Sequence, residues 1–543
     1  MNWKTLAVLA ALACRPAVAA DVRAVAERIR TEAARGNDSP EGRPLPLATH
    51  WCTGSHRNSE GFAPVHQIEW IERGRHILPW FHHPRRDAEL SEEGRERFRA
   101  YFEKAIRRAA EMKLPLCFKA SQWEKFLSAK PTVELPPEQN PNVVGADGKI
   151  QKMVSPFGPV GPWRELGRTY TDNPQMKRLQ AWYPDPPLVV FLSNNEHRKL
   201  RWHQAETSKR YLAKHGEGKD ADFKRKVVAD GWIERFRALQ GGFRDGLTSP
   251  RWRQNAMFVG YGAFGPEHLG RWGGWPRYAL HSKGRITPYP LMWDGGSPSY
   301  YTHDWNPSTD HTVWSPQVEF QNLVFVQREA LKLNPRFWVE MSVWDGYSPS
   351  KPGKKPRNVP TPTLYRLKGQ TYDPTRYRGF VQFGMWLLRP RAVREFRGWT
   401  FPSEEGLPYF GALCDAVDRV HNSATLREWW RKGTLVPNRA HVHHYQAAIP
   451  DEWRQVDRWF LLDTSLDPPH PWELFWELRV FALALVRGEK PGRQWLVYAH
   501  APVKARKGVK LTIPEYREIT VDVSVGGSFY LLDEKAGSIS PVK

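Results

Sequence analysis

The feature that most constrains the fold is an alternation of short apolar runs with longer amphipathic stretches between about residues 45 and 400. The apolar runs have the length and composition of strands buried on both faces, and segments such as 91–113 and 315–334 have helical character. Strands that alternate with helices pair in parallel. Eight such units predict an α/β fold, a (β/α)8 TIM barrel, with strands at 46–54, 76–81, 114–121, 187–196, 255–265, 298–305, 336–346 and 379–388.

The pattern changes beyond residue 400. Residues 408–433 have the pattern of one or two further helices, and short strand-like segments separated by turn signals follow from about 450. These segments predict a C-terminal antiparallel β-sandwich domain. We therefore expect a catalytic barrel over 45–435 and a β-domain over 436–543, which either supports the barrel or binds carbohydrate.

The N-terminus has the pattern of a secretory signal. A short basic start is followed by an apolar run and by Ala17-Val18-Ala19, a small-x-small cleavage site. We expect residues 1–19 to be a signal peptide, 20–44 to be an N-terminal helix and lead-in, and the protein to be exported to the periplasm or beyond. Lipidation at Cys14 is the weaker alternative, because the leucine of the motif is one position out of place.

Composition indicates the kind of partner. The formal net charge is +22, which favours a polyanion such as an anionic or sulfated polysaccharide, and the 26 tryptophans provide flat apolar faces for sugars or for packing. After cleavage Cys52, Cys117 and Cys414 remain, an odd number without C-x-x-C spacing, which argues against a disulfide framework or a zinc cluster. Export and the lack of a recognised motif argue against nucleic acid.

Two glutamates stand out on the predicted barrel strands. Glu196 ends the fourth strand in the sequence PLVVFLSNNE, and Glu340 lies within the seventh, flanked by Val339 and Met341. Catalytic groups of such barrels lie at the C-terminal strand ends. Two carboxylates facing each other across the barrel mouth suit glycoside hydrolysis. The alternatives are a helix cap or Arg pairing for Glu196, and a buried ion pair for Glu340.

This pattern resembles the clan A retaining glycoside hydrolases over about residues 45–400. The resemblance rests on Asn-Glu ending strand four, Glu in strand seven and Trp ending strand eight. It implies that Glu196 is the acid/base, that Glu340 is the nucleophile, that Asn195 binds the sugar 2-hydroxyl, and that Trp386 forms the floor of the sugar subsite.

Further polar and aromatic residues at the predicted strand ends are candidates for binding the sugar, with packing as the alternative for each. They are His50, Trp51, His82, His83, Lys119, Tyr261, His303 and Trp344.

Other classes of function remain open. The histidines of HVHHY (441–445) could indicate a metal site, but no carboxylate or thiol stands at ligand spacing, so we expect no metal and no cofactor. A polysaccharide lyase would use a Tyr, His or Lys base and would not need the paired glutamates. In a non-catalytic carbohydrate-binding protein, both glutamates would serve only as hydrogen-bonding groups.

Overall fold

The computed structural model describes most of the barrel and of the C-terminal domain. The described residues are 45–51, 64–81, 83, 92–121, 123–194, 197–261, 289–297, 299–301, 334, 337–344, 373–395, 407–436, 438, 461–464, 480–502 and 504–542. Within them no helix is long and apolar enough to cross a membrane.

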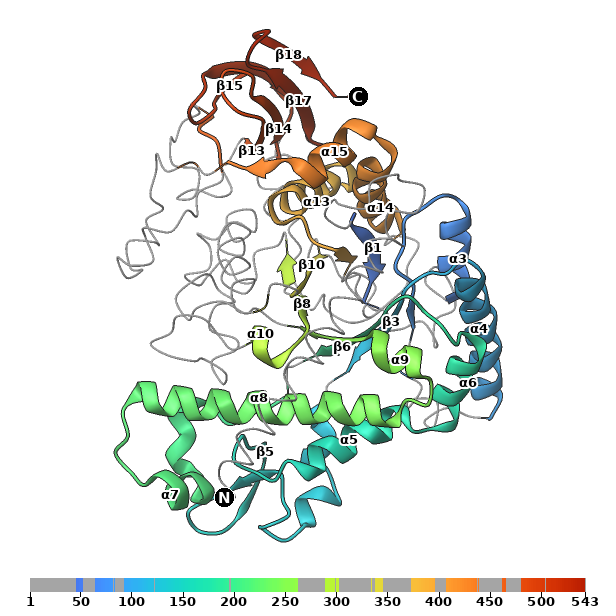
Figure 1. Cartoon of the computed structure of the whole chain (residues 1–543), viewed down its shortest axis with the longest axis vertical. Helices are drawn as coiled ribbons and strands as arrows, with labels where there is room; N and C mark the ends of the chain where they lie inside the picture. The colour runs from blue at the N-terminus through green and yellow to red at the C-terminus, as the bar shows by residue number, and fades with distance from the viewer. Residues whose placement is uncertain are drawn as a thin grey trace, which may run out of the picture.

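A parallel sheet forms the centre of the molecule (Figure 1). Its members follow one another around the sheet in chain order, and β8 and β9 both pair with β10, so that together they make the sixth barrel strand. They are β1 (Leu47–His50), β2 (Trp80–Phe81), β3 (Leu116–Ser121), β6 (Val189–Asn194), β7 (Ala256–Tyr261), β8 (Gly295–Ser297), β9 (Ser299–Tyr301), β10 (Trp338–Trp344) and β11 (Ala392–Glu395).

The sheet closes on itself. Ala48 of β1 forms a parallel bridge with Ile77, just before β2. The amide of Leu78 donates to the carbonyl of Ala48 at 2.9 Å, and β1 pairs on its other side with β11. Closure removes both sheet edges, so the predicted (β/α)8 barrel is confirmed.

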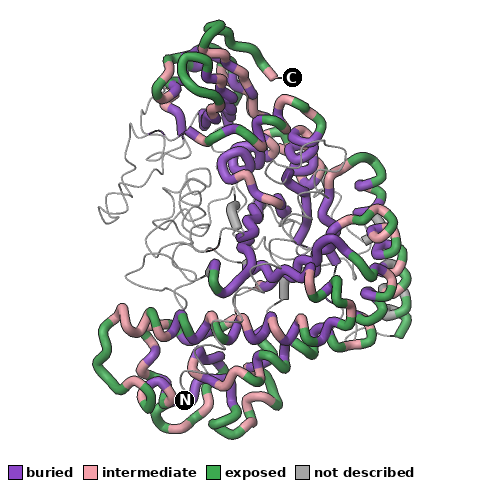
Figure 2. Tube along the Cα trace, viewed as in Figure 1, coloured by how far each residue is buried: buried purple, intermediate pink, exposed green. Residues whose placement is uncertain are grey.

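Helices cover the outside of the barrel (Figures 1 and 2). They bury an outward-facing row of phenylalanines, Phe81, Phe118, Phe191 and Phe258, which are in register on neighbouring strands. The rings of Phe118 and Phe191, like those of Phe191 and Phe258, lie 5.4 Å apart. The described helices of the barrel are α3 (Pro64–Glu72), α4 (Glu92–Glu111), α5 (Gly161–Thr171), α6 (Pro174–Trp182), α8 (Ala221–Gly246), α9 (Pro250–Asn255), α10 (Tyr289–Met292), α13 (Pro374–Leu388) and α14 (Leu407–Asn422).

The prediction of the eighth strand was wrong. Residues 379–388 belong to helix α13, and the eighth strand is the short β11 that follows it. Every residue from Gly379 to Leu388 is buried, so this segment lacks the polar face that marks a surface helix, and an apolar run of this kind reads equally well as a strand. The start of the helix carries its own signal, because Asp373 caps the amide of Arg376 and Pro374 occupies the first turn.

From Gly379 to Leu388, helix α13 is buried on all sides because it lies between the barrel and the C-terminal domain (Figure 2). That domain packs one face of its main sheet on α13 and α15 (Ala424–Lys432) and the other on the hairpin of β15 (Arg506–Thr512) and β16 (Glu518–Val523). It is the predicted antiparallel β-sandwich. The main sheet has the order β12 (Thr434–Leu435), β13 (Phe481–Arg487), β14 (Gln494–His500), β17 (Ser528–Asp533) and β18 (Ser538–Pro541).

Side-chain alternation in β13 and β14 divides the two cores. Phe481 and Tyr498 join the core that is continuous with the barrel helices, whereas Ala482 and Trp495 join the core under the hairpin. Polar contacts fix the same interface, since the hydroxyl of Tyr498 donates to the carbonyl of Gly379 at 2.6 Å. The C-terminal domain thus completes the hydrophobic core around α13.

Candidate functional site

The strand order decides where the two predicted glutamates belong. Counted around the closed sheet, β6 is the fourth strand and β10 is the seventh. Glu340 lies in β10, and Asn194 is the last residue of β6. Asn195 and Glu196 follow Asn194 directly in the chain but lie outside the described residues, as do His82 and His303.

Glu340 is completely buried and makes a two-point ion pair with Arg394 of the eighth strand. Nε of Arg394 lies 2.8 Å from Oε2 of Glu340, and Nη2 lies 2.9 Å from Oε1. The indole Nε1 of Trp338 donates to the same Oε1 at 3.1 Å. Glu340 therefore forms a buried ion pair, which was the alternative to a catalytic role in the sequence analysis. The burial of both charges is compensated by their pairing.

The contacts of Arg394 show that this pair faces the interior of the barrel. Its Nη2 lies 3.4 Å from Sγ of Cys117 on β3, which is separated from β11 in the sheet by β1 and β2. A side chain can bridge such distant strands only through the barrel lumen. The guanidinium also donates to the carbonyl of His50 at 2.9 Å.

The electrostatics of this group follow from its burial. Burial raises the pKa of the Cys117 thiol to about 11, and nearby Arg394 only partly offsets this shift, so Cys117 is neutral. Burial opposes the charge of Arg394, but the carboxylate of Glu340 outweighs it and raises the pKa of Arg394 above its usual range. Cys117 and Cys414 are both free and buried.

Several predicted sugar-binding residues lie inside the packed structure. His50 is 1% exposed, with its ring 5.2 Å from that of Trp80, and Trp51 is also buried. His83 is buried with its ring 4.7 Å from that of Tyr170 in α5. In this structure the three side chains make packing contacts, and packing was the alternative to sugar binding for each of them.

The remaining candidates divide into two groups. Lys119, Tyr261 and Trp344 lie on barrel strands β3, β7 and β10, towards their C-terminal ends, and their side chains lie outside the described part of the structure. Trp386 was placed wrongly by the sequence, since it belongs to α13 and not to a strand end. Its ring packs against Trp430 of α15 and Phe529 of β17, at 5.2 and 5.4 Å, so it serves the interface between the barrel and the C-terminal domain.

A second buried ion pair lies beside the fourth strand and was missed by sequence reasoning. Glu124, in the 3₁₀ turn η2 (Trp123–Ser128) that follows β3, is fully buried, and its Oε1 lies 2.5 Å from Nζ of Lys199. Lys199 follows β6 by five positions. The pair therefore joins the C-terminal ends of barrel strands three and four, where catalytic groups of such barrels gather.

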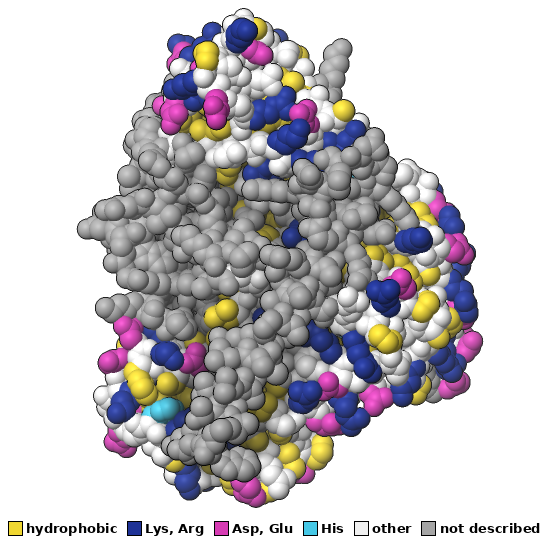
Figure 3. Space-filling model, viewed as in Figure 1, with side chains coloured by type: hydrophobic (Ala, Val, Ile, Leu, Met, Phe, Trp, Pro, Cys, Tyr) yellow, Lys and Arg dark blue, Asp and Glu magenta, His cyan; other side chains and the backbone are white. Residues whose placement is uncertain are grey.

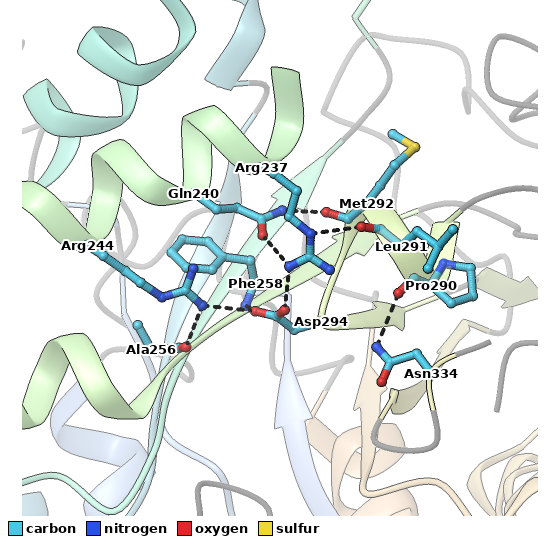
Figure 4. Close-up of polar contacts among 10 residues, drawn as sticks. All are labelled: Arg237, Gln240, Arg244, Ala256, Phe258, Pro290, Leu291, Met292, Asp294 and Asn334. Atoms are coloured by element: carbon cyan, nitrogen blue, oxygen red, sulfur yellow. Dashed lines mark hydrogen bonds and ion pairs between the residues drawn. The ribbon is translucent and has the colours of Figure 1, made fainter. Parts of the chain in front are cut away.

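The opposite end of the barrel has a buried carboxylate of structural character (Figure 4). Asp294, which precedes β8, accepts from Arg237 of α8 at 2.9 Å and from Arg244 at 3.3 Å, and its Oδ2 accepts the amide of Phe258 at 3.1 Å. Burial opposes its ionisation, but the two guanidinium groups outweigh this and lower the pKa of Asp294. The cluster fastens α8 to the N-terminal ends of β7 and β8.

Comparisons with known proteins give likenesses of overall structure only. No protein-family model matches the chain, and no curated protein matches it significantly.

The described residues contain no cluster of three metal-ligating side chains.

Three of the similar solved structures are described as glycoside hydrolases. A modular endo-β-1,4-mannanase of family 26 from Cellulomonas fimi has 10% identity and a TM-score of 0.36, with 96% of each chain covered. A family 5 enzyme from Prevotella bryantii, solved with a xyloglucan tetradecasaccharide, has 10% identity and a TM-score of 0.33 over 72% of this chain and 98% of its own. A family 51 α-L-arabinofuranosidase from Bifidobacterium longum has 10% identity and a TM-score of 0.31 over 86% and 83%. The assignment of the barrel rests on the strand pairing of this chain.

Proposed function

We propose that the protein is an exported retaining glycoside hydrolase that cleaves β-glycosidic bonds of a polysaccharide or oligosaccharide. Glu340 would act as the nucleophile and Glu196 as the acid/base. One observation carries the proposal: the pairing order of the closed barrel makes β6 the fourth strand and β10 the seventh. Glu340 lies on strand seven, and Glu196 comes two residues after strand four in the chain, which is the pair of strands that the resemblance requires.

The surroundings of Glu340 support a role as nucleophile. An attacking carboxylate must be held in one orientation, and the guanidinium of Arg394 binds both oxygens of Glu340. Glu340 would attack the anomeric carbon while Glu196 protonates the leaving oxygen. Water would then hydrolyse the glycosyl-Glu340 ester, with Glu196 now acting as base. For this chemistry the two carboxyl groups should lie about 5–5.5 Å apart.

The substrate class follows from charge. The protein has 80 Lys and Arg against 58 Asp and Glu, and this excess of positive charge favours an anionic polysaccharide such as a sulfated galactan as substrate. Figure 3 shows the described Lys and Arg side chains interspersed with Asp and Glu over the visible face. This distribution favours recognition of a polymer through several separate contacts.

A second candidate, a non-catalytic carbohydrate-binding protein, has one observation in its favour. Glu340 is 0% exposed, and both of its oxygens are engaged by Arg394, as a purely structural ion pair would be. The two candidates differ in what the loss of the carboxylate does. In a hydrolase, loss of the carboxylate abolishes turnover even in the protein that remains folded with Arg394 unpaired, whereas a binding protein has no turnover to lose.

The deciding experiment begins with a screen of purified protein on neutral and sulfated polysaccharides, reading reducing ends and ultraviolet absorbance together. New reducing ends without absorbance, abolished in both Glu340→Gln and Glu196→Gln, support the hydrolase. Absorbance of an unsaturated uronate that survives in both variants would identify a lyase instead. Azide added to Glu340→Gly provides the sharper assay, because a small nucleophile that occupies the vacated site restores turnover and yields a glycosyl azide of inverted configuration.

The proposed export has its own test. Expression of the full chain with a C-terminal tag, followed by N-terminal sequencing of the exported protein, should show cleavage after Ala19. A protein retained in the cytoplasm with residues 1–19 attached would contradict export and leave the catalytic proposal standing.

A further inference from the structure

The Glu124–Lys199 pair joins the two loops that follow barrel strands three and four. Glu124 comes three residues after β3, and Lys199 comes five residues after β6. Their side chains are 0% and 1% exposed, and Nζ lies 2.5 Å from Oε1. Among the described residues, Lys199 is the cation within ion-pair distance of Glu124.

Stability alone does not account for such a pair. Two charges removed from water lose hydration that their mutual attraction recovers only in part, and an apolar pair of similar volume is often at least as stable. A buried pair does fix geometry, because each partner holds the other in one position. Pairs that break the usual rules of burial concentrate at functional sites.

Hydrogen bonds hold the backbone around Lys199 in place. Lys199 forms a bridge with Val154, the last residue of β5 (Ile150–Val154), and the amide of Leu200 donates to the carbonyl of Val154 at 3.1 Å. Nζ of Lys199 also donates to the carbonyl of His197 at 2.9 Å. Nε1 of Trp232 in α8 donates to the carbonyl of Leu200 at 3.3 Å.

These contacts fix one side of the segment that carries the proposed acid/base. On the other side Asn194 is fixed in β6, paired with Tyr261 of β7. Asn195 and Glu196 fall between the two anchors in the chain, and three peptide bonds separate Glu196 from Lys199.

We infer that Glu124 and Lys199 are positioning residues for Glu196, and that their ion pair sets the place of the acid/base relative to the glycosidic oxygen. This inference rests on the proposed function. A group that only holds the acid/base should affect the steps that need proton transfer and should spare those that do not. Its signature is therefore a dependence on the leaving group.

The test compares two substrates of the sugar found in the screen: the unactivated oligosaccharide and its dinitrophenyl glycoside. Departure of dinitrophenolate needs little help from a general acid, whereas an alkoxide leaving group needs it fully. We expect Lys199→Met to lower kcat/KM for the oligosaccharide by about 10- to 100-fold, the loss typical of a misplaced catalytic group. The dinitrophenyl glycoside should be affected far less.

Two further variants keep the test decisive. Lys199→Met leaves Glu124 buried without its cation and can unfold the protein, so the double variant Glu124→Gln/Lys199→Met, which removes both charges, is measured beside it. The matched control is Arg237→Met, which breaks the buried pair with Asp294 at the opposite end of the barrel. It should lower the unfolding midpoint and leave the ratio of the two activities unchanged.

The outcomes separate this inference from the proposed function. Equal losses on both substrates, or no loss in the folded double variant, would overturn the inference while a Glu196-dependent hydrolase remained. Wild-type protein without hydrolytic activity, or with activity indifferent to Glu196→Gln, would overturn the proposed function and the inference with it.

Discussion

Arg394 holds Glu340 by both carboxylate oxygens inside the barrel, with Nε–Oε2 and Nη2–Oε1 distances of 2.8 and 2.9 Å. The two residues come from adjacent strands, where Ser342 is the register partner of Arg394 and Glu340 that of Ala392. Arg394 also reaches Cys117 across the lumen. One cation therefore connects three strands of the barrel and fixes the carboxylate that we propose as the nucleophile.

Removal of the cation should be costly. Arg394→Met leaves Glu340 buried and uncompensated, and we expect a loss of about 3–5 kcal/mol in the free energy of unfolding, measured by urea denaturation. The double variant Glu340→Gln/Arg394→Met should recover part of this loss, because no charge remains buried. If the single variant is as stable as wild type, Glu340 is not ionised in the folded protein.

The stability of the protein should decrease as the pH is lowered, because two histidines are buried in their neutral form. Burial, together with the neighbouring His76, lowers the pKa of His421 to about 3, and burial lowers the pKa of His500 to about 3. The unfolded chain takes up a proton on each below about pH 6.5, whereas the folded protein does not. Stability is thus complete above pH 6.5 and is lost as pH falls towards 3, by about 1.4 kcal/mol per pH unit for each histidine.

The measurement is urea unfolding at several pH values between 6.5 and 4.5, where carboxylates contribute little. His421→Gln should reduce the slope, because it removes one of the histidines whose pKa is lowered by burial. The environment of His421 includes the ring of His76 stacked at 3.6 Å, together with Asp418 and Arg427. A wild-type stability that does not vary over this range would contradict neutral burial.

The packing of α8 on α5 depends on one of two adjacent glycines. A Cβ on Gly242 would lie 1.8 Å from the backbone carbonyl oxygen of Arg164, which cannot give way without moving α5. A Cβ on Gly241 would meet only the guanidinium of Arg164, at 3.4 Å. We expect Gly242→Ala to destabilise the protein by several kcal/mol. Gly241→Ala should be neutral or stabilising by up to about 1 kcal/mol, because alanine favours helix. Thermal unfolding of the two variants compares them directly, and equal midpoints would refute the close approach.

Trp386 should act through packing and not through the substrate. Trp386→Ala removes a buried ring from between α15 and β17, which should cost about 3–5 kcal/mol. Because the barrel helices and one face of the C-terminal sheet share a core, both domains should lose stability in one transition. Intrinsic fluorescence and limited proteolysis during urea unfolding would report the two parts separately. A lower affinity for the polysaccharide without loss of stability would restore the sugar-binding prediction.

The sequence by itself determined the alternation of strands and helices, and with it the barrel. Parallel strands buried on both faces must be apolar throughout, so segments such as 187–196 are visible as local patterns. The same reasoning placed Glu340 on strand seven, where the structure has it, because an ionisable group in such a run is conspicuous. Its assignment of Glu196 to the end of strand four stays a prediction, since Glu196 lies outside the described residues. It also predicted the sandwich, from short strand-like segments separated by turn signals.

The tertiary structure decided what these local patterns could not. Residues 379–388 form a helix because the C-terminal sheet covers the face that a surface helix would expose to water, and that cover comes from a hundred residues further along the chain. The short strand β11 has two charged residues, Arg394 and Glu395, among its four, so it did not look like a buried barrel strand. The partners of Glu340 and Glu124 come from other strands and loops, so only the closure of the barrel brings each carboxylate to its cation.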